Sequence, residues 1–373
     1  MAEIALPIYL WIVRTLASLV VLCTALPFVR HGAWWIRAWD FPRVQVLALG
    51  LVVIAGTILI SSATRWRLDM IAVAAACSAA VIIQAAQVAP YTTLWPKSVP
   101  TTRSDSTSLL VVNLDVRNDR KDEVAASIRG VDADLLLVIE LDEHWEDGLR
   151  ALRSRYPHRV GVTRSEGLGI ALWSKLPLKD ARVEHLVSDR RASVHATVQP
   201  ARGPSFRFVG VHPTPPGLAV QQGEGRYDSR IRDAELLLIA DAVGDARSAG
   251  DDTPWIIAGD FNDVAWSHAT RRFQRVSGLL DPRVGRGLMN TYHARYPLLR
   301  YPLDHVFMSP SFGVGSMERV RVPGSDHFAV WVDFSLLDTM AKSPQTKTVD
   351  EQDITETIRE GVSNAQERGE QAE

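Results

Sequence analysis

Long apolar runs fill the first ninety residues of the chain, whereas apolar and polar positions alternate over shorter distances in the remainder. A helix needs roughly 20 apolar residues to cross the hydrocarbon core of a bilayer, with about 17 as the lower limit. Three runs reach that length, the second only just: Ala5–Val29, Val44–Ile60 and Met70–Val88. The pattern predicts a membrane anchor with three transmembrane helices over residues 1–89.

The residues beside these runs are typical of membrane interfaces. Tryptophan concentrates at the interface, and five tryptophans flank the runs: Trp34, Trp35, Trp39, Trp66 and Trp95. Arg14 lies inside the first run, and we expect its side chain to extend to the nearer interface. A cleaved signal peptide is the alternative for the first run, but that run lacks a basic amino-terminal region and two further runs follow it.

The loop charges bear on which side of the cell membrane this multi-pass protein places its soluble part. One side holds Arg30, Arg37, Arg43, Lys97 and Arg103, and the other holds Arg65 and Arg67, with Arg14 as a third residue that can be counted there. Cytoplasmic loops usually carry more Lys and Arg than loops on the other side of the membrane. The count of five against two or three therefore favours a cytoplasmic carboxyl-terminal domain. The difference is small, so the side stays open.

Composition divides the rest of the chain into three parts. Residues 90–108 are rich in Pro, Ser and Thr and are expected to form a linker. Residues 109–337 have the pattern of a globular domain. Residues 338–373 are polar and acidic with almost no large apolar side chains, so we expect a disordered tail.

Short apolar strands dominate the domain, and a few helical patterns interrupt them. The predicted strands are Ser108–Asn113, Asp134–Glu140, Gly167–Ser174, Ser193–Val198, Phe206–His212, Pro254–Asp260, Leu303–Met308 and His327–Phe334. The predicted helices are Asp119–Gly130 and Ser229–Ala246. Several strands are apolar on both faces, which is typical of strands covered on two sides. The pattern predicts an α/β domain of two packed, mostly antiparallel sheets with helices outside.

Charge and cysteine content exclude some functions. The net charge of −2 provides no overall basic field for nucleic acid. The two cysteines, Cys23 and Cys77, both lie in the apolar runs, so a disulfide framework or a cysteine-based metal site is not expected.

Polar side chains able to bind a metal or a phosphate stand at six strand ends. They are Asn113 and Asp115, Glu140, His212, Asp260 and Asn262, Asp304, and Asp326 with His327. One such residue is more often a cap or a turn residue, but six in one domain predict a shared site. Clustered carboxylates repel one another, and a hard divalent cation relieves that repulsion. Oxygen ligands without cysteine favour Mg²⁺ or Mn²⁺.

The order of these motifs resembles the endonuclease/exonuclease/phosphatase superfamily. The chain carries N-x-D, a glutamate, G-x-G-x-A-x-x-S-K, H-P, G-D-F-N, P-L-D-H-V-F and G-S-D-H in that order. The superfamily includes DNase I-like nucleases, abasic-site endonucleases, neutral sphingomyelinases and inositol-polyphosphate 5-phosphatases. The resemblance covers about residues 109–336 and implies a four-layer α/β sandwich.

The resemblance also implies roles for individual residues. Glu140 matches the metal-ligand glutamate, Asn113 the residue that places the phosphate near the metal, and Asp115 and Asp326 acidic residues near it. His212 matches a phosphate contact, Asp260 and Asn262 the pair that orients the attacking water, and Asp304 with His327 a carboxylate–imidazole pair. Either Asp260 or the His327–Asp304 pair can be the general base. Arg232 is a candidate for supporting the site.

The resemblance implies the class of bond better than the substrate. A phosphoesterase gains most from membrane anchoring when its phosphate-ester substrate shares the membrane, so a lipid-linked substrate is favoured. A tethered nuclease acting on DNA or RNA is the first alternative, and a catalytically inactive binding module is the second. The lipid bilayer is the expected partner, and the oligomeric state stays open.

Overall fold

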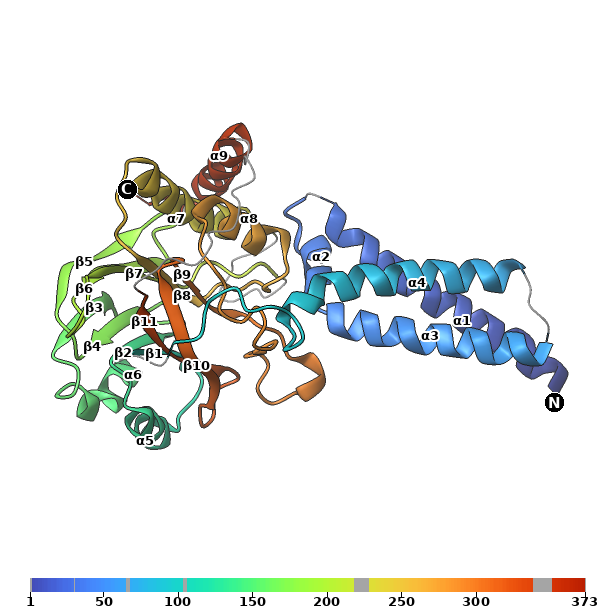
Figure 1. Cartoon of the computed structure of the whole chain (residues 1–373), viewed down its shortest axis with the longest axis horizontal. Helices are drawn as coiled ribbons and strands as arrows, with labels where there is room; N and C mark the ends of the chain where they lie inside the picture. Colours follow the sequence, from blue (N-terminus) through green and yellow to red (C-terminus); the bar gives the residue numbers. More distant parts are fainter. Residues whose placement is uncertain are drawn as a thin grey trace.

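Two parts of different shape make up the molecule. The computed structural model describes residues 2–29, 31–64, 68–102, 106–217, 228–337 and 351–372. A bundle of three long helices extends from one side of an α/β domain (Figure 1). The amino terminus lies at the end of the bundle far from the domain, and the last strands lie inside the domain (Figure 1).

The bundle consists of the three predicted apolar helices. Its elements are α1 (Ala2–Ala25), η1 (Leu26–Phe28), α2 (Trp34–Arg37), η2 (Ala38–Asp40), α3 (Arg43–Thr64), α4 (Leu68–Val88) and η3 (Ala89–Tyr91). The stretches Leu6–Phe28, Arg43–Ser62 and Leu68–Tyr91 are long and apolar enough to span a membrane. Less than a third of each of these stretches is buried inside the molecule, so most of their apolar surface faces outward. Arg14 pairs with Asp69 at the start of α4.

The first sheet of the domain has six strands in the order β10-β11-β1-β2-β4-β3. The strands are β1 (Thr107–Asn113), β2 (Leu135–Ile139), β3 (His158–Val162), β4 (Ile170–Ser174), β10 (Phe312–Arg321) and β11 (Phe328–Leu336). Only β1 and β2 run parallel. The other neighbours are antiparallel.

The second sheet has five strands in the order β5-β6-β7-β8-β9. They are β5 (Leu178–His185), β6 (Ala192–Val198), β7 (Phe206–Val211), β8 (Trp255–Asp260) and β9 (Asp304–Met308). Here β7 and β8 are the parallel pair. The two sheets bury their inner faces against each other, with Leu137, Phe208 and Val306 in the shared core.

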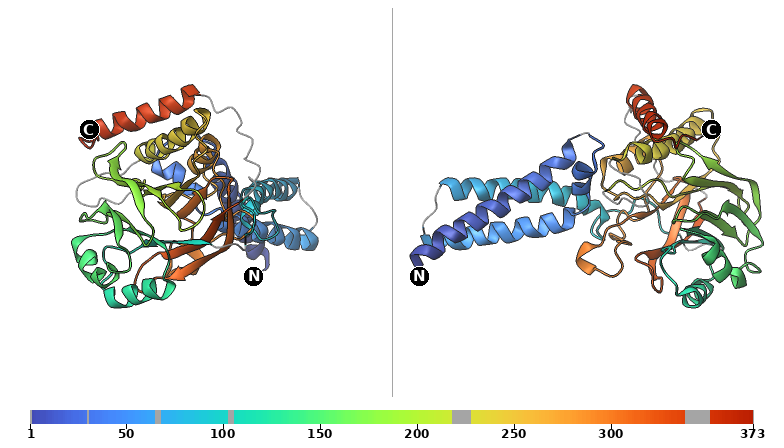
Figure 2. Two further views of the ribbon diagram at one scale, coloured as in Figure 1. Left: turned by 60° about the vertical axis from the view of Figure 1, so that its left-hand side comes forward. Right: turned by 180° about the vertical axis from the view of Figure 1, so that it is seen from behind.

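Helices cover the outer face of each sheet and complete four layers (Figure 2). The first sheet packs against α5 (Lys121–Val131), α6 (Glu143–Gly148) and η4 (Arg150–Leu152) through residues such as Ile128 and Trp145. The second packs against α7 (Arg230–Ser248) and α8 (His268–Ser277) through residues such as Leu236 and Phe273. The predicted four-layer α/β sandwich with three preceding apolar helices is confirmed.

The strands that the sequence did not predict are the most exposed or irregular ones. Much of β3 and β5 faces solvent, so neither shows the continuous apolar run of a central strand. In β10 a bulge between Val314 and Met317 breaks the alternation of apolar positions.

Helix α8 begins at the N-cap Ser267, whose hydroxyl accepts the Thr270 N–H, and ends at Gly278 in a left-handed conformation.

The segment between the apolar helices and the domain lies against the domain. Tyr91, at the end of the third apolar stretch, donates its hydroxyl to the Ala265 carbonyl at 2.8 Å. Val99 is fully buried in the core between the sheets, and Thr101 forms a bridge with Val314. The expected linker is therefore held at several points along its length.

The expectation of a disordered tail does not hold for residues 351–372. Residues Glu351–Glu367 form helix α9, which packs along α7. Ile354, Gly361 and Ala365 are buried on one face, and Ser188 forms a bridge with Gln371. The polar composition concealed a narrow stripe of small and apolar residues at helical spacing.

Some sequence-based expectations fall outside the described residues. These are the positions of Arg30, Arg65, Trp66, Arg67 and Arg103, and of residues 338–350 of the tail.

Candidate active site

The topology brings the polar strand ends to one edge of the sandwich. Strands β1 and β2 are parallel, as are β7 and β8, so their carboxyl ends meet at the same edge of each sheet. Strands β9 and β11 run antiparallel to β8 and β1 and begin at this edge. Asp304, the first residue of β9, is the register partner of Asp260, the last residue of β8.

Gly259 explains part of the GDFND motif. A Cβ atom at this position would overlap the carbonyl oxygen of Val211 on the neighbouring strand β7. Glycine is therefore needed for the close approach of the two strands immediately before Asp260.

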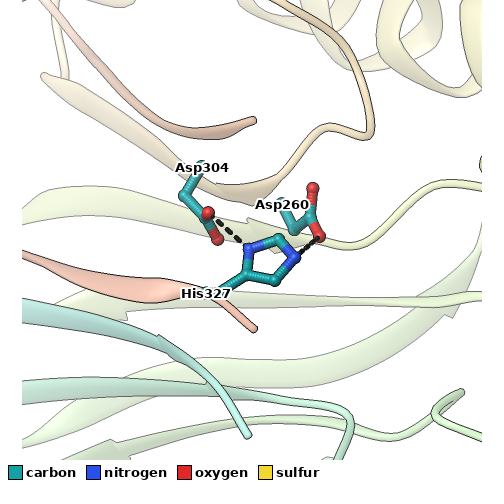
Figure 3. Close-up of side chains that lie close together, drawn as sticks. All are labelled: Asp260, Asp304 and His327. Carbon is teal, nitrogen blue, oxygen red and sulfur yellow. Dashed lines mark hydrogen bonds and ion pairs between the residues drawn. The ribbon is translucent and has the colours of Figure 1, made fainter. Parts of the chain in front are cut away.

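His327 lies between two buried carboxylates (Figure 3). Its Nδ1 is 2.8 Å from Oδ2 of Asp304, within hydrogen-bond distance. Its Nε2 lies 3.7 Å from Oδ2 of Asp260. A ring with a carboxylate at each nitrogen is favoured in the doubly protonated, cationic form.

The pKa values at this cluster follow from burial and charge. Burial alone would lower the pKa of His327, but the carboxylates of Asp304 and Asp260 outweigh it and raise that pKa to about 10. Burial, together with the negative charge of Asp304, raises the pKa of Asp260 to about 7. At neutral pH the imidazole is thus cationic, and Asp260 is the group able to accept a proton.

Asp260 is held by hydrogen bonds from two asparagines. Its Oδ1 accepts the backbone N–H of Asn262 at 2.9 Å, and its Oδ2 accepts the Nδ2 amide of Asn113 at 3.2 Å. The side chain of Asn262 donates to the carbonyl of Pro213, at 3.0 Å. His212 Nε2 lies 4.0 Å from Oδ2 of Asp260. The other four predicted catalytic residues therefore surround Asp260: Asn262, His212 and His327 lie next to its carboxylate, and Asp304 is linked to it through the His327 ring.

A second group of carboxylates faces the same cavity. Burial raises the pKa of Glu140, and the charges of Asp115 and Asp326 add to that effect. Glu140 Oε2 also accepts the backbone N–H of Val116 at 2.9 Å. The amide oxygen of Asn113 accepts the N–H of Asp115. The four predicted metal-site residues thus lie together, although the Asn113 amide is engaged with its protein neighbours.

Three site residues adopt an uncommon backbone conformation. Asp115, Glu140 and Asn262 have φ values of 58°, 63° and 50°. Residues other than glycine occupy this left-handed region at a cost, and such positions cluster at functional sites. In each case the residue follows the end of a strand, where the turn directs its side chain or its neighbours into the cavity.

A cavity of about 330 Å³ contains these groups and several residues that the sequence motifs did not mark. Arg191 is buried, and its Nη1 lies 2.9 Å from Nδ1 of His212. Arg117 lies between Asp115 and Asp326, with its Nε donating to Asp115. Phe41, from the connection between α1 and α3, also lines the cavity. Phe41 and Arg191 gave no signal in the sequence, because they reach the site through tertiary packing, whereas Arg117 stands only two residues after Asp115.

Arg232 supports the site from behind. It is almost fully buried, and its Nη1 donates to the backbone carbonyl of Asn262 at 2.9 Å. His305 supports the same loop, because its Nε2 lies 2.8 Å from the carbonyl of Asp263. These contacts fix the backbone that carries Asp260 and Asn262.

Comparison with known structures finds a similar domain in proteins of low sequence identity. The human Nocturnin catalytic domain with bound sulfate anion is 17% identical, with a TM-score of 0.49, and the match covers 62% of this chain and 95% of that one. Sphingomyelinase C from Streptomyces griseocarneus is 17% identical, with a TM-score of 0.45, 62% of this chain and 99% of that chain being covered.

An endonuclease/exonuclease/phosphatase from Bacteroides vulgatus is 20% identical, with a TM-score of 0.49, covering 63% of this chain and all of that chain. No curated protein matches the sequence. The model of the Endonuclease/Exonuclease/phosphatase family matches residues 110–327, from the first strand of the domain to the histidine of the site. The chain belongs to the Endonuclease/Exonuclease/phosphatase family.

Proposed function

We propose that this protein is a membrane-anchored, divalent-metal-dependent phosphoesterase that hydrolyses a phosphodiester, phosphomonoester or pyrophosphate bond of a lipid-linked substrate. The observation that carries this proposal is the placement of His327 between Asp304 and Asp260, across one cavity from Glu140. The arrangement pairs a cationic donor with a carboxylate base beside a separate group of oxygen ligands.

The carboxylates around Glu140 fit a hard divalent cation. Glu140, Asp115 and Asp326 offer oxygen atoms to one cavity, and Mg²⁺ or Mn²⁺ prefers such ligands. Asp260, Asp304 and His327 also lie close enough together to hold an ion. The Nδ1 of His327 is already engaged with Asp304 at 2.8 Å, and the family resemblance gives the metal-ligand role to Glu140. We therefore assign the metal to the Glu140 group, with Asn113 beside it.

The chain's own residues then have separate roles in hydrolysis. A divalent metal, when bound, polarises a phosphoryl oxygen and offsets its developing negative charge. Asp260 accepts a proton from the attacking water, which Asn262 helps to orient. Cationic His327 donates to a phosphoryl oxygen, and Asp304 holds its ring in place. His212, whose Nε2 is 4.0 Å from Asp260, and Arg191 beside it bind the phosphate.

The apolar helices support a lipid-linked substrate over a soluble one. Three helices able to span a membrane precede the domain. Confining enzyme and substrate to one plane raises the effective concentration to roughly millimolar. A nuclease gains no such advantage, and the net charge of −2 provides no overall attraction for a polyanion.

Hydrolysis assays of the full chain in lipid nanodiscs test this function. The substrates are phospholipids, a prenyl pyrophosphate, bis-p-nitrophenyl phosphate, supercoiled DNA and single-stranded RNA, each with Mg²⁺, Mn²⁺ or a chelator. We expect chelator-sensitive release from a lipid, and loss of that activity in Asp260→Asn. Asp251→Asn is the matched control, because Asp251 precedes β8 at the opposite edge of the sheet.

Other outcomes would replace the proposal. Nicking of plasmid DNA that disappears in Asp260→Asn would identify a tethered nuclease. Inactivity on every substrate by a folded protein would favour a binding module.

A further inference from the structure

The anchor contributes directly to the wall of the catalytic cavity. Phe41 lies in the short connection between η2 and α3, and its ring lines the cavity that contains Asp260 and His327. It packs edge-on against Tyr301, with ring centroids 5.5 Å apart. The end of the bundle nearest the domain therefore borders the opening of the site.

The bundle and the domain share an apolar cluster at this border. Tyr91 from the anchor packs with Trp266 and Leu303 from the domain, and Phe41 and Val44 lie against them. Leu303 directly precedes Asp304 in the sequence. Because these contacts are buried, they fix the position of the site relative to the start of α3 and the end of α4.

An exposed apolar loop stands beside the same end of the bundle (Figures 1 and 2). In this loop, Tyr296–Leu299, the side chains of Tyr296, Leu298 and Leu299 are 57%, 82% and 53% exposed. The Leu298 carbonyl accepts a hydrogen bond of 2.7 Å from Nε2 of Gln45, in the first turn of α3. The loop is thus fastened to the start of an apolar helix while its leucines face outward.

Other exposed apolar residues follow the ends of the apolar helices. Phe28 and Val29 come at the end of the first, Trp35 is on α2, and Leu94 and Trp95 follow the third. All are exposed. Chain connectivity puts them at the end of the bundle that meets the domain, level with the start of α3. Tryptophan and leucine at that level are typical of residues that lie in a membrane interface.

Two arginines flank the apolar loop. Arg295 and Arg300 bound Tyr296–Leu299, and each donates to a backbone carbonyl, Arg295 to Gly324 and Arg300 to Ala294. Basic residues on either side of an apolar tip fit a leaflet surface, where they face lipid phosphates while the tip enters the acyl region. The loop therefore combines an exposed apolar tip with flanking basic residues, as suits a lipid leaflet.

We propose that the Tyr296–Leu299 loop inserts into the leaflet beside α3, and that the catalytic cavity takes its substrate from that leaflet between this loop and Phe41. The ligand is an amphiphile with its phosphate ester at the membrane surface. The second half of this inference rests on the proposed function, whereas the first half does not.

The depth of the loop can be measured without any activity. The full chain with Cys23→Ala and Cys77→Ala carries a spin label at Leu298→Cys, in nanodiscs of phosphatidylcholine and phosphatidylglycerol. A label at Lys179→Cys, on the exposed edge strand β5, is the control. We expect the label at 298 to collide readily with oxygen and to be protected from a water-soluble nickel chelate, and the label at 179 to show the reverse. Equal access of the nickel chelate to both labels would overturn the insertion.

The entry route has its own test in Leu298→Ser/Leu299→Ser. We expect hydrolysis of a phospholipid in the nanodisc to fall by about tenfold or more, with hydrolysis of soluble bis-p-nitrophenyl phosphate unchanged. Loss of both activities, or of neither, would overturn this route. A wild-type chain that hydrolyses neither substrate would refute the proposed function, while the spin-label depths would still decide where the loop lies.

Discussion

Trp266 donates its indole N–H to the backbone carbonyl of Asp40 at 2.7 Å, and so joins the loop after the GDFND motif to the connection between two apolar helices. Trp266 is buried. Because Trp266 is six residues from Asp260, this bond ties the position of the Asp260 carboxylate to the apolar helices.

Replacing Trp266 with Phe should weaken that tie. The loss of one buried hydrogen bond costs about 1–3 kcal/mol when its acceptor is left unsatisfied. We expect faster amide hydrogen exchange at residues 263–267 and a lower unfolding temperature of the full chain. Trp255→Phe, at the opposite end of β8, should leave exchange at those residues unchanged. If both variants exchange alike, the bond does not hold the loop.

The pair of Asp304 and His327 predicts a pH effect. The carboxylates raise the pKa of His327 to about 10, against the effect of burial. If the cationic ring is needed, activity is present below that pKa and is lost as the pH rises through it. Asp304→Asn removes one carboxylate, so the alkaline limb of kcat/KM should move to lower pH. A limb at the same pH in variant and wild type would exclude His327 as its source.

Arg191 should contribute to phosphate binding. It is buried in the cavity beside His212, where a guanidinium can form two parallel bonds to a phosphate. We expect Arg191→Gln to lower kcat/KM by about 10- to 100-fold, and Arg191→Lys to restore part of it, since an ammonium keeps the charge but not the planar geometry. The neighbouring Arg190→Gln is the control. Equal loss in the Gln and Lys variants with normal folding would point to a packing role.

Glu235 should make stability depend on pH. It is buried on α7, and burial raises its pKa to about 8 in spite of the nearby charge of Arg191. A raised folded-state pKa contributes stability that is full below about pH 4.5 and is lost as the pH rises toward about 8, at about 1.4 kcal/mol per pH unit. Glu235→Gln should be insensitive to this change.

Unfolding of the two chains from pH 5 to pH 8.5 measures this difference. We expect Glu235→Gln to become the more stable chain as the pH rises. Parallel curves would show that Glu235 does not titrate in this range.

The sequence predicted the part of the site that lies along strands. Apolar runs ending in Asn113, Glu140, His212 and Asp260 were visible as a pattern, and strand pairing at one edge brings such ends together. The positions of Phe41 and Arg191 could not be predicted, because they depend on packing between segments far apart in the chain. Whether each side chain plays its assigned role stays a prediction.

Helix α9 was missed for a different reason. Its composition is typical of a disordered segment, and its apolar residues are few. What orders it is local fit: Gly361 lies so close to α7 that a Cβ there would overlap Ala234, and Arg272 pairs with Asp353 at 3.1 Å. Composition averages over such contacts and therefore does not detect them.

The pairing of β1 with β11 has a consequence for how the domain forms. The first strand of the domain lies between β2 and the last strand, so Leu110 pairs with Trp331 across more than two hundred residues of chain. Loop closure over such a distance slows folding. Until β11 has been synthesised, one edge of β1 is unpaired, and an apolar unpaired edge promotes aggregation. The nascent domain is thus most exposed to aggregation in the interval between the synthesis of β1 and that of β11.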